Sequence, residues 1–188
     1  MKYICLLMLT ISQIFAEDIS DKEAQYGMVV EFTQQIADEV KIKLEKKELN
    51  ENEIYTMLSS LVAFDTRVWS AALAFTPSFI DDLDASDWSG FDQPWHYYQL
   101  SNGKKLYAPY VWRASNNILH AENIANPKSK FGYDYTSGQW AWWSQAIDSG
   151  APMWMKPVYS NLTGDRMVTY SLPISREAVL IFNVYYGV

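Results

Sequence analysis

Apolar residues that recur at steps of three and four positions predict two helices at the start of the chain. The first stripe runs from residue 19 to about residue 49, on a background of Glu, Lys, Gln and Ala. The second covers residues 51–64, directly after Asn50, which is a suitable N-cap residue. This period places the apolar side chains on one face of a helix. We therefore expect a long helix followed by a shorter one.

Beyond the second helix, the pattern changes to the apolar runs typical of strands. Residues 68–75 predict a buried strand, and residues 106–113 predict another, in which Pro109 indicates an edge position or a bulge. Residues 139–149 predict a short helix that ends at Gly150. Three more strands are expected at residues 153–159, 166–172 and 178–186. Short turns join these runs, so the expected fold class is α+β, a long N-terminal helix on an antiparallel sheet.

Residues 77–105 predict a long loop, and long loops in compact domains are usually functional. Part of this loop resembles a calcium-binding loop, because Asp82, Asp84 and Ser86 have the alternating spacing. However, Asp87 stands where the glycine of such a loop belongs, and no glutamate closes it. We therefore expect a solvated acidic loop and no metal site.

The first sixteen residues have the layout of a secretory signal peptide, in which Lys2 precedes an apolar run that ends at Ala16. The run covers residues 3–16, whereas a membrane-spanning helix needs about 20 apolar residues. An uncleaved anchor is the alternative. We expect a periplasmic or secreted bacterial domain at residues 17–188. Its core alone would hold it together, because the only cysteine, Cys5, lies in the signal peptide.

The charge balance and the motifs present exclude several functions. The chain has 15 Lys and Arg residues against 22 Asp and Glu residues, so it repels nucleic acid and no such partner is expected. His96 and His120 have no metal-ligand spacing, and the motifs of serine hydrolases, zinc peptidases and phosphate-binding loops are missing. We expect no catalytic residue and no cofactor. Carboxylates paired in space leave an exported hydrolase open as an alternative.

Aromatic residues are concentrated in residues 133–159, which contain seven of them in 27 positions, four of them tryptophan. Trp140, Trp142 and Trp143 cannot all face one core, because their side chains point in different directions. At least one should face solvent or a cavity, and exposed indoles usually mark a binding surface.

Several short stretches, in this order, resemble motifs of extracytoplasmic Cache sensor domains. They are residues 107–113 (YAPYVWR), 133–136 (YDYT), 142–143 (WW), 154–159 (WMKPVY) and 167–174 (MVTYSLPI). The resemblance covers residues 68–186, and the long leading helix fits the same family. It implies a PAS-like antiparallel sheet backed by that helix, with a site for a small molecule on one side of the sheet.

The same resemblance implies a function in signal transduction or chemotaxis. The ligand-binding residues we expect are Tyr110, Arg113, Tyr135, Trp140, Trp142, Trp143, Trp154 and Tyr170. Arg113 would hold a carboxylate or carbonyl with its planar fork, or it is a strand residue paired with an acid at the surface. Asp134 is expected to cap its own turn. Because the chain ends after the last predicted strand, we expect a stand-alone domain that signals through a membrane receptor or kinase.

The chain departs from the amino-acid-binding version of this pattern. That version has an Arg before the aromatic pair and an Asp after the "PY" stretch, whereas residues 138–141 read GQWA and residues 159–161 read YSN. An α-amino acid is therefore not the expected ligand. An acidic, indole-rich site favours an amine through cation–π contact, or a flat heterocycle. A carbohydrate-binding or scaffold protein with an aromatic platform is the alternative from another class.

Overall fold

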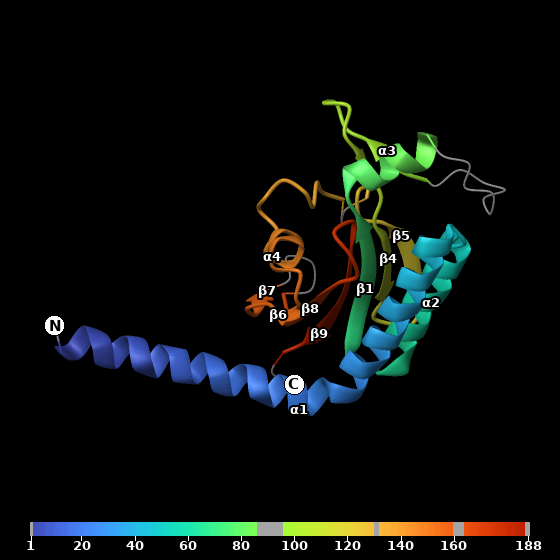
Figure 1. Ribbon diagram of the computed structural model, residues 1–188. Helices are drawn as coiled ribbons and strands as arrows, with labels where there is room; N and C mark the ends of the chain where they lie inside the picture. Colours follow the sequence, from blue (N-terminus) through green and yellow to red (C-terminus); the bar gives the residue numbers. More distant parts are fainter. Residues whose placement is uncertain (1, 86–95, 130–131, 160–163, 187–188) are drawn as a thin grey trace.

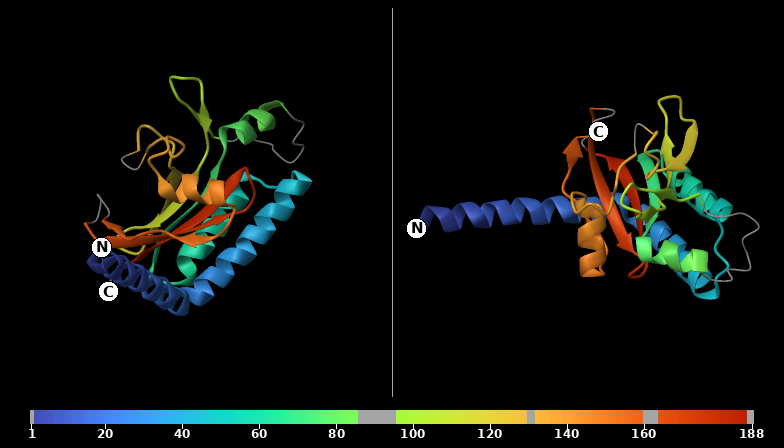
Figure 2. Two further views of the ribbon diagram at one scale, coloured as in Figure 1. Left: turned by 60° about the vertical axis from the view of Figure 1, so that its left-hand side comes forward. Right: turned by 90° about the horizontal axis from the view of Figure 1, so that it is seen from above.

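Antiparallel strands form a sheet, and helices cover it from two sides (Figures 1 and 2). The computed structural model describes residues 2–85, 96–129, 132–159 and 164–186, with side chains from residue 21 onwards except those of residues 84 and 85. The α+β fold class expected from the sequence, with a long N-terminal helix and an antiparallel sheet, is confirmed.

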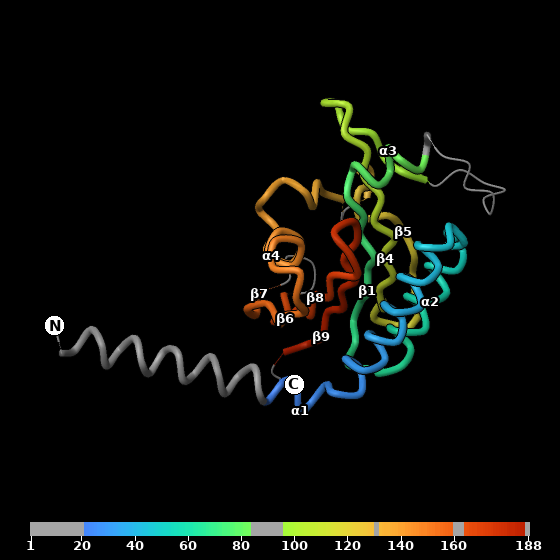
Figure 3. The backbone as a smooth tube through the Cα atoms, in the orientation of Figure 1, coloured from blue at the N-terminus to red at the C-terminus, as the bar shows by residue number. Residues whose placement is uncertain are grey.

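The part of helix α1 (Lys2–Lys46) from Tyr26 onwards, together with helix α2 (Glu51–Phe64), packs against one face of the sheet, which we call the α1 face. The apolar stripe of α1 is buried there, Ile36 and Val40 included. Asn50 caps α2 as expected. Its Oδ1 accepts the Glu53 N–H at 2.9 Å, and Glu53 Oε2 accepts the Asn50 N–H at 3.3 Å. This reciprocal capping box defines the start of α2. After the end of α2, the chain enters the first strand (Figure 3).

The sheet has the strand order β5-β4-β1-β9-β8-β6, and β7 pairs with β8. The strand bounds are β1 (Val68–Phe75), β4 (Pro109–Arg113), β5 (Leu119–Asn123), β6 (Met153–Trp154), β7 (Val158–Tyr159), β8 (Arg166–Pro173) and β9 (Ala178–Tyr185). Every pairing is antiparallel. β1 lies between β4 and β9, so it is buried on both faces and along its whole length.

Helix α4 (Ala141–Ser149) covers β8 and β9 on the other face of the sheet, which we call the α4 face (Figure 2). The helix ends as expected at Gly150, whose φ of 62° is the left-handed conformation that glycine adopts readily. Strand alternation turns Leu73 and Phe75 of β1 to the α1 face, and Ala72 and Ala74 to the α4 face. At these four positions β1 thus presents large side chains to the α1 face and small ones to the α4 face.

A β-bulge interrupts this alternation near the start of β1. Val68 lies opposite Val184, whereas Ser70 lies opposite Asn183, so β1 has one extra residue in between. Trp69 packs in the cluster of the α4 face, and the Ser70 hydroxyl bonds the Asn183 side chain at 2.8 Å. The bulge thus places two consecutive side chains on the α4 face.

Residues 77–105 do not form the long loop that we expected. They contain helix α3 (Pro77–Ala85) and a ribbon of β2 (Tyr98–Gln99) and β3 (Lys105–Leu106), which lie beyond the end of β1 (Figure 1). Thr76 caps α3, because its Oγ1 accepts the Phe79 N–H at 3.3 Å, and proline suits a first helical position. Asp81 pairs with Lys105 at 3.3 Å. Residues 86–95, and with them part of the acidic stretch, lie outside the described residues.

Two strand predictions need correction. The strand expected at residues 106–113 is divided, and β4 begins at Pro109. We expected Pro109 at an edge or a bulge, but β4 lies between β1 and β5; the missing N–H is tolerated because Pro109 is the first residue of its strand. β5 was not expected, because its sequence, LHAEN, has only Leu119 and Ala121 as apolar residues, and it lies at the edge of the sheet. The run at residues 153–159 likewise divides into β6 and β7.

Within the part of the chain that the structure describes, none of the helices is both long enough and apolar enough to cross a membrane. The expected signal peptide, residues 1–16, falls where no side chains are described.

Arg113, at the end of β4, closes the C-terminal end of α2. Its Nη2 donates a hydrogen bond to the Val62 carbonyl, and its Nε donates to the Val68 carbonyl at 3.4 Å. The last carbonyls of a helix have no partner within the helix, and the negative end of the helix dipole favours a cation there. Arg113 therefore joins α2 to the sheet on the α1 face.

Replacing Arg113 by alanine is expected to lower the free energy of unfolding by about 1–3 kcal/mol, because hydrogen bonds from a charged donor are lost. Urea unfolding followed by circular dichroism measures this change. Arg176→Ala is the matched control, because Arg176 is exposed in the turn between β8 and β9; it should change stability by less than about 0.5 kcal/mol. Equal losses in the two variants would contradict the role of Arg113 at the helix end.

Candidate ligand-binding site

Three buried rings, those of Tyr135, Trp142 and Trp143, pack together on the α4 face. The Tyr135 centroid lies 5.0 Å from that of Trp143 and 6.0 Å from that of Trp142, and the two indoles are 6.1 Å apart. Small strand residues belong to the same cluster, among them Ala72 and Ala74. These alanines leave room for the rings, so this part of the α4 face is filled by the protein's own aromatic side chains.

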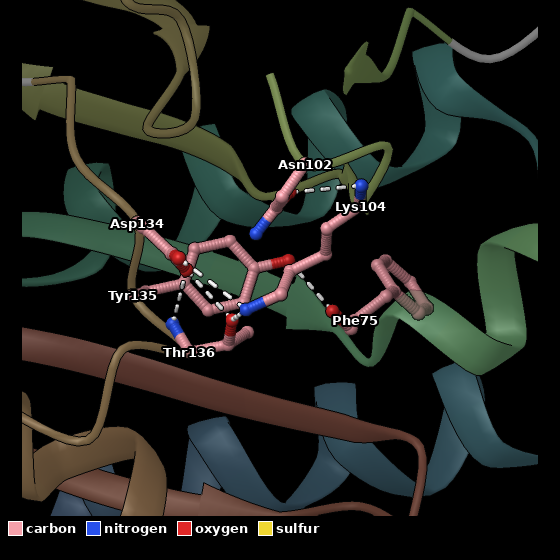
Figure 4. A network of polar contacts seen from close by, with 6 residues as sticks. All are labelled: Phe75, Asn102, Lys104, Asp134, Tyr135 and Thr136. Atoms are coloured by element: carbon pink, nitrogen blue, oxygen red, sulfur yellow. Dashed lines mark hydrogen bonds and ion pairs between the residues drawn. The ribbon is translucent and has the colours of Figure 1, made fainter. Parts of the chain in front are cut away.

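The Tyr135 hydroxyl fastens this group to the end of β1 (Figure 4). It donates to the Phe75 carbonyl at 2.6 Å and accepts the Tyr107 N–H at 3.2 Å. Burial raises the pKa of Tyr135, although the contacts with these two backbone groups act in the opposite direction. The hydroxyl therefore stays protonated and holds residues 133–136 against the sheet.

Asp134 caps its own turn, as the sequence predicts. Its Oδ1 accepts the Thr136 N–H at 2.9 Å and the Thr136 hydroxyl at 2.6 Å, and Lys104 Nζ lies 3.4 Å from Oδ2 (Figure 4). Burial alone would raise the pKa of Asp134, but the hydrogen bonds from Thr136 and the charge of Lys104 outweigh it and lower the pKa. The Asp134 carboxylate therefore stabilises the turn of residues 134–136 and pairs with Lys104.

A row of rings crosses the α4 face from β1 to the edge strand β5. Trp69 meets Tyr110 edge-on with centroids 6.3 Å apart. Tyr110 stacks on Trp112 at 5.5 Å, and Trp112 stacks on His120 at 5.1 Å. Tyr110 is buried, Trp112 is half-buried and His120 is exposed. The row therefore leads from the interior to the surface, and its outer rings are accessible.

Hydrogen-bonding side chains form a second row, which crosses β8, β9, β1 and β4. The Thr169 hydroxyl donates to Asn183 Oδ1 at 2.5 Å, and Asn183 Nδ2 donates to Ser70 Oγ at 2.8 Å. Ser70 in turn hydrogen-bonds Tyr110. Burial raises the pKa of Tyr110, and the hydrogen bond with Ser70 acts in the opposite direction. We call this set, Thr169, Asn183, Ser70 and Tyr110, the polar row.

Glu122 places a carboxylate on the same face. It lies opposite Tyr110 in the β4–β5 pair, so both side chains point to one side of the sheet. Its Oε1 accepts the Ser129 hydroxyl at 2.6 Å. Tyr133 stacks on Trp140 at 3.8 Å, and a hydrogen bond joins its hydroxyl to Trp142. The α4 face thus combines ring surfaces, hydroxyl groups and a negative charge.

The structure divides the expected ligand-binding residues between the two faces. Five of them, Tyr110, Tyr135, Trp140, Trp142 and Trp143, share the α4 face. Trp154 and Tyr170 lie on the α1 face, with centroids 4.9 Å apart, and Arg113 bonds to α2 there. Side chains on opposite faces of a sheet cannot contact one small molecule together. The three neighbouring indoles pack in one cluster, contrary to our expectation, because Trp142 and Trp143 are buried in it and the half-buried Trp140 packs against it. Their contact with a ligand stays a prediction.

Sequence reasoning missed several residues of the α4 face: Trp69, Ser70, Trp112, Glu122, Tyr133, Thr169 and Asn183. One available signal was a lone polar residue inside an apolar strand, such as Ser70 in VWSAALAF or Asn183 in AVLIFNVY. Buried polar side chains need hydrogen-bond partners, so two such residues point toward each other or toward a ligand. Among the residues that the structure describes, no group of three or more His, Cys, Asp or Glu side chains could hold a metal ion.

Solved structures with a similar fold include extracellular domains of candidate histidine kinases. That of soHK1S-Z6 is 21% identical with a TM-score of 0.57, and the match covers 95% of this chain and 63% of that one. That of mmHK1S-Z2 is 15% identical with a TM-score of 0.49, covering 85% and 60%. The ligand-binding domain of the Campylobacter jejuni chemoreceptor Tlp3, in complex with L-valine, is 11% identical with a TM-score of 0.48, covering 94% and 62%. The chain thus spans less than two thirds of each of these structures.

No curated protein matches the chain significantly. A family model does match, over residues 54–184, and it describes the first PDC sensor domain of methyl-accepting chemotaxis protein-like proteins. The matched region begins in α2 and ends in β9, so it includes every strand of the sheet and α4. The resemblance to Cache sensor domains is thereby confirmed. The chain belongs to the methyl-accepting chemotaxis protein-like family of first PDC sensor domains.

Proposed function

We propose that this sensor domain binds a small organic amine on the α4 face, outside the cytoplasm, and passes its bound state to a membrane receptor or kinase. The observation that carries this proposal is the stacked row from Tyr110 to His120 with the Glu122 carboxylate on the same face. The binding site would lie beside the half-buried Trp112, next to the filled cluster of Tyr135, Trp142 and Trp143.

The charges on this face favour a cation. Ring faces attract ammonium groups, most strongly where water is partly excluded, and the half-buried Trp112, which stacks on Tyr110 and His120, lies in the outer part of the row of rings. Glu122 supplies an opposite charge on the strand next to Tyr110, and the chain as a whole has a net charge of −7. Arg113, the cation that we expected to hold a ligand carboxylate, lies on the α1 face. A carboxylate ligand would therefore lack that clamp, whereas an amine would find both rings and a counter-charge.

The end of β9 offers a route from the ligand to α1. The Tyr185 ring packs in the cluster of the α4 face, and its carbonyl accepts a hydrogen bond from the Tyr26 hydroxyl of α1 at 3.1 Å. Tyr186 follows. The Nζ of Lys22, from α1, lies 4.6 Å from the centroid of the Tyr186 ring, and the Cζ of Arg166 lies 4.4 Å from it. A ligand that moves Tyr185 would therefore act on α1 through both contacts, and α1 would carry the change onward.

Binding of an amine is expected to raise the melting temperature of the protein, because a ligand that binds only the folded state stabilises it. A thermal-shift screen should include aliphatic and aromatic amines, heterocycles, organic acids and oligosaccharides. Glu122→Gln should lower the affinity for the best amine by about ten- to a hundredfold, because a charged hydrogen-bond partner is lost. Glu177→Gln is the matched control, since Glu177 is exposed in the turn before β9. Stabilisation by oligosaccharides alone would favour the aromatic platform instead, and a folded protein that no compound stabilises would contradict the proposal.

Tyr26→Phe is expected to uncouple α1 from the ligand, because it removes the hydrogen bond to the Tyr185 carbonyl and leaves the α4 face unchanged. Hydrogen exchange of residues 21–46, with and without the best amine of the screen, measures the coupling. The ligand-dependent difference in the exchange rates of the α1 amides should shrink, while the affinity for the amine should change by less than about threefold. Tyr159→Phe, at an exposed position of β7, is the control and should keep the difference. An unchanged response in Tyr26→Phe would exclude this route.

A further inference from the structure

We propose that the edge strand β5 pairs with β5 of a second copy of this chain, in antiparallel orientation and with Ala121 at the two-fold axis. The two sheets would then join into one. The proposal goes beyond the proposed function, because it concerns a contact between two protein chains and the pairing itself needs no ligand. It rests on the outward backbone groups of β5, on the accessibility of the strand, and on the charges of His120 and Glu122.

The hydrogen bonds at the two ends of the β4–β5 pair show which backbone groups of β5 face outwards. At one end, the Ala114 N–H donates to the Ile118 carbonyl at 2.9 Å. At the other end, the Ile124 N–H donates to the Ala108 carbonyl at 2.8 Å. Bonded and non-bonded pairs alternate along an antiparallel ladder, so the even-numbered residues of β5 bond to β4. The N–H and C=O groups of Ala121, in the middle of β5, therefore point away from β4.

The outer side of β5 is accessible to another chain. Among the strands that the structure describes, β5 is the last one on its side of the sheet. His120 and Ala121 are exposed, and Ile118, just before the strand, is 55% exposed although its side chain is large and apolar. An edge strand with outward N–H and C=O groups is a template for pairing with a further strand.

A two-fold axis at Ala121 makes β5 complementary to itself. Ala121 would exchange both of its backbone hydrogen bonds with its own copy, and His120 would lie directly opposite Glu122 of the second copy. Both side chains lie on the α4 face, because they are opposite Trp112 and Tyr110 in the β4–β5 pair. The imidazole has an N–H donor in either protonation state, and the carboxylate would accept it.

Neighbouring registers lack this match. A shift of the second copy by two residues in one direction places His120 opposite its own copy, and a shift in the other direction places Glu122 opposite its own copy. Like charges directly opposite each other destabilise a sheet. A shift by one residue would set outward backbone groups of one copy against inward groups of the other, so no ladder would form. The sequence of β5 therefore specifies one register.

The helices leave room for the second copy. A two-fold axis perpendicular to the sheet keeps the α4 faces of both copies on one side and both α2 helices on the other. α2 packs over β1 and β4. β4 and its copy would be three strand spacings apart, about 14 Å, whereas packed helices need only about 8–10 Å between their axes. The two α2 helices would therefore not collide.

The pairing would bring a residue of the second copy to the proposed amine site. His120 stacks on Trp112 at 5.1 Å, so the stacked row of each copy would end beside Glu122 of the other. Glu122 is also the proposed counter-charge of the amine. A bound amine would therefore compete with His120 of the second copy for the same carboxylate.

Sedimentation velocity of the full chain over a range of concentrations tests the pairing. We expect a weak monomer–dimer equilibrium, because one strand pair buries less than the roughly 1,200 Å² of stable interfaces. Ala121→Pro should raise the dissociation constant at least about tenfold, because proline removes the outward N–H of the residue at the axis. The fold should tolerate this change, since proline is accepted on an edge strand where the N–H faces away from the sheet. Circular dichroism checks that the variant is folded.

The charge pair provides a second test, which leaves the backbone unchanged. His120→Glu should raise the dissociation constant about three- to thirtyfold, because it sets two carboxylates opposite each other on both sides of the axis. Adding Glu122→Lys to His120→Glu should restore the dimer, because the pair is then reversed. Arg176→Glu is the matched control, since Arg176 is exposed in the turn between β8 and β9, and it should keep the dissociation constant.

A natural chain that stays monomeric up to millimolar concentration would overturn the inference. So would a dimer that Ala121→Pro and His120→Glu leave unchanged, because its interface would then lie elsewhere on the molecule. Both results would leave the proposed amine site standing. Failure of the folded protein to bind any amine would contradict the proposed function and leave this pairing standing.

Discussion

The rest of the structure depends on one constraint, the alternation of side chains along a central strand that is buried on both sides. β1 pairs with β4 and β9, and all eight of its residues are buried. Its large residues, such as Leu73 and Phe75, meet the helices of the α1 face, whereas Ala72 and Ala74 face α4. The α1 face is a helix-on-sheet core of the usual kind. The α4 face has room for side chains that arrive from distant parts of the chain.

Those arriving side chains divide the α4 face into two regions of different composition. Tyr135, Trp142 and Trp143 fill the first region, and the Tyr135 hydroxyl holds them to the end of β1. The second region contains the stacked row that reaches His120 and the polar row that ends at Tyr110. Large buried rings give the first region its rigidity. The second region has polar groups and accessible rings, and this composition supports the proposal of a site for a small molecule there.

The proposed sensory role requires that the α4 face communicate with the helix on the opposite face. The last residues of β9 offer one route for the proposed communication, because the Tyr185 ring and the Tyr185 carbonyl contact different faces. Tyr186 adds contacts with Lys22 and Arg166. A small shift at this strand end would therefore alter how α1 packs, without any change in the core around β1.

The sequence by itself determined the local elements and the family. The capping residue Asn50 gave α2 its start, Gly150 ended α4, and the apolar runs located β1, β8 and β9. These features depend on residues close together in the chain, so periodicity and turn chemistry reveal them. The order of short motifs around the YDYT stretch identified the sensor family, which the match over residues 54–184 confirms.

Only the tertiary structure decided which expected site residues lie together. The alternation within one strand already separates Tyr110 from Arg113, which lies three positions away. The placement of Trp154 and Tyr170 on the α1 face depends instead on how distant strands pair and on which side the helices cover the sheet. The partners of Asn183 depend on the register of three strands, β8, β9 and β1, and no local pattern encodes a register between distant segments. Local energetics determine how each segment folds. The contacts that assemble a binding surface are long-range, and they are settled only when the sheet closes around β1.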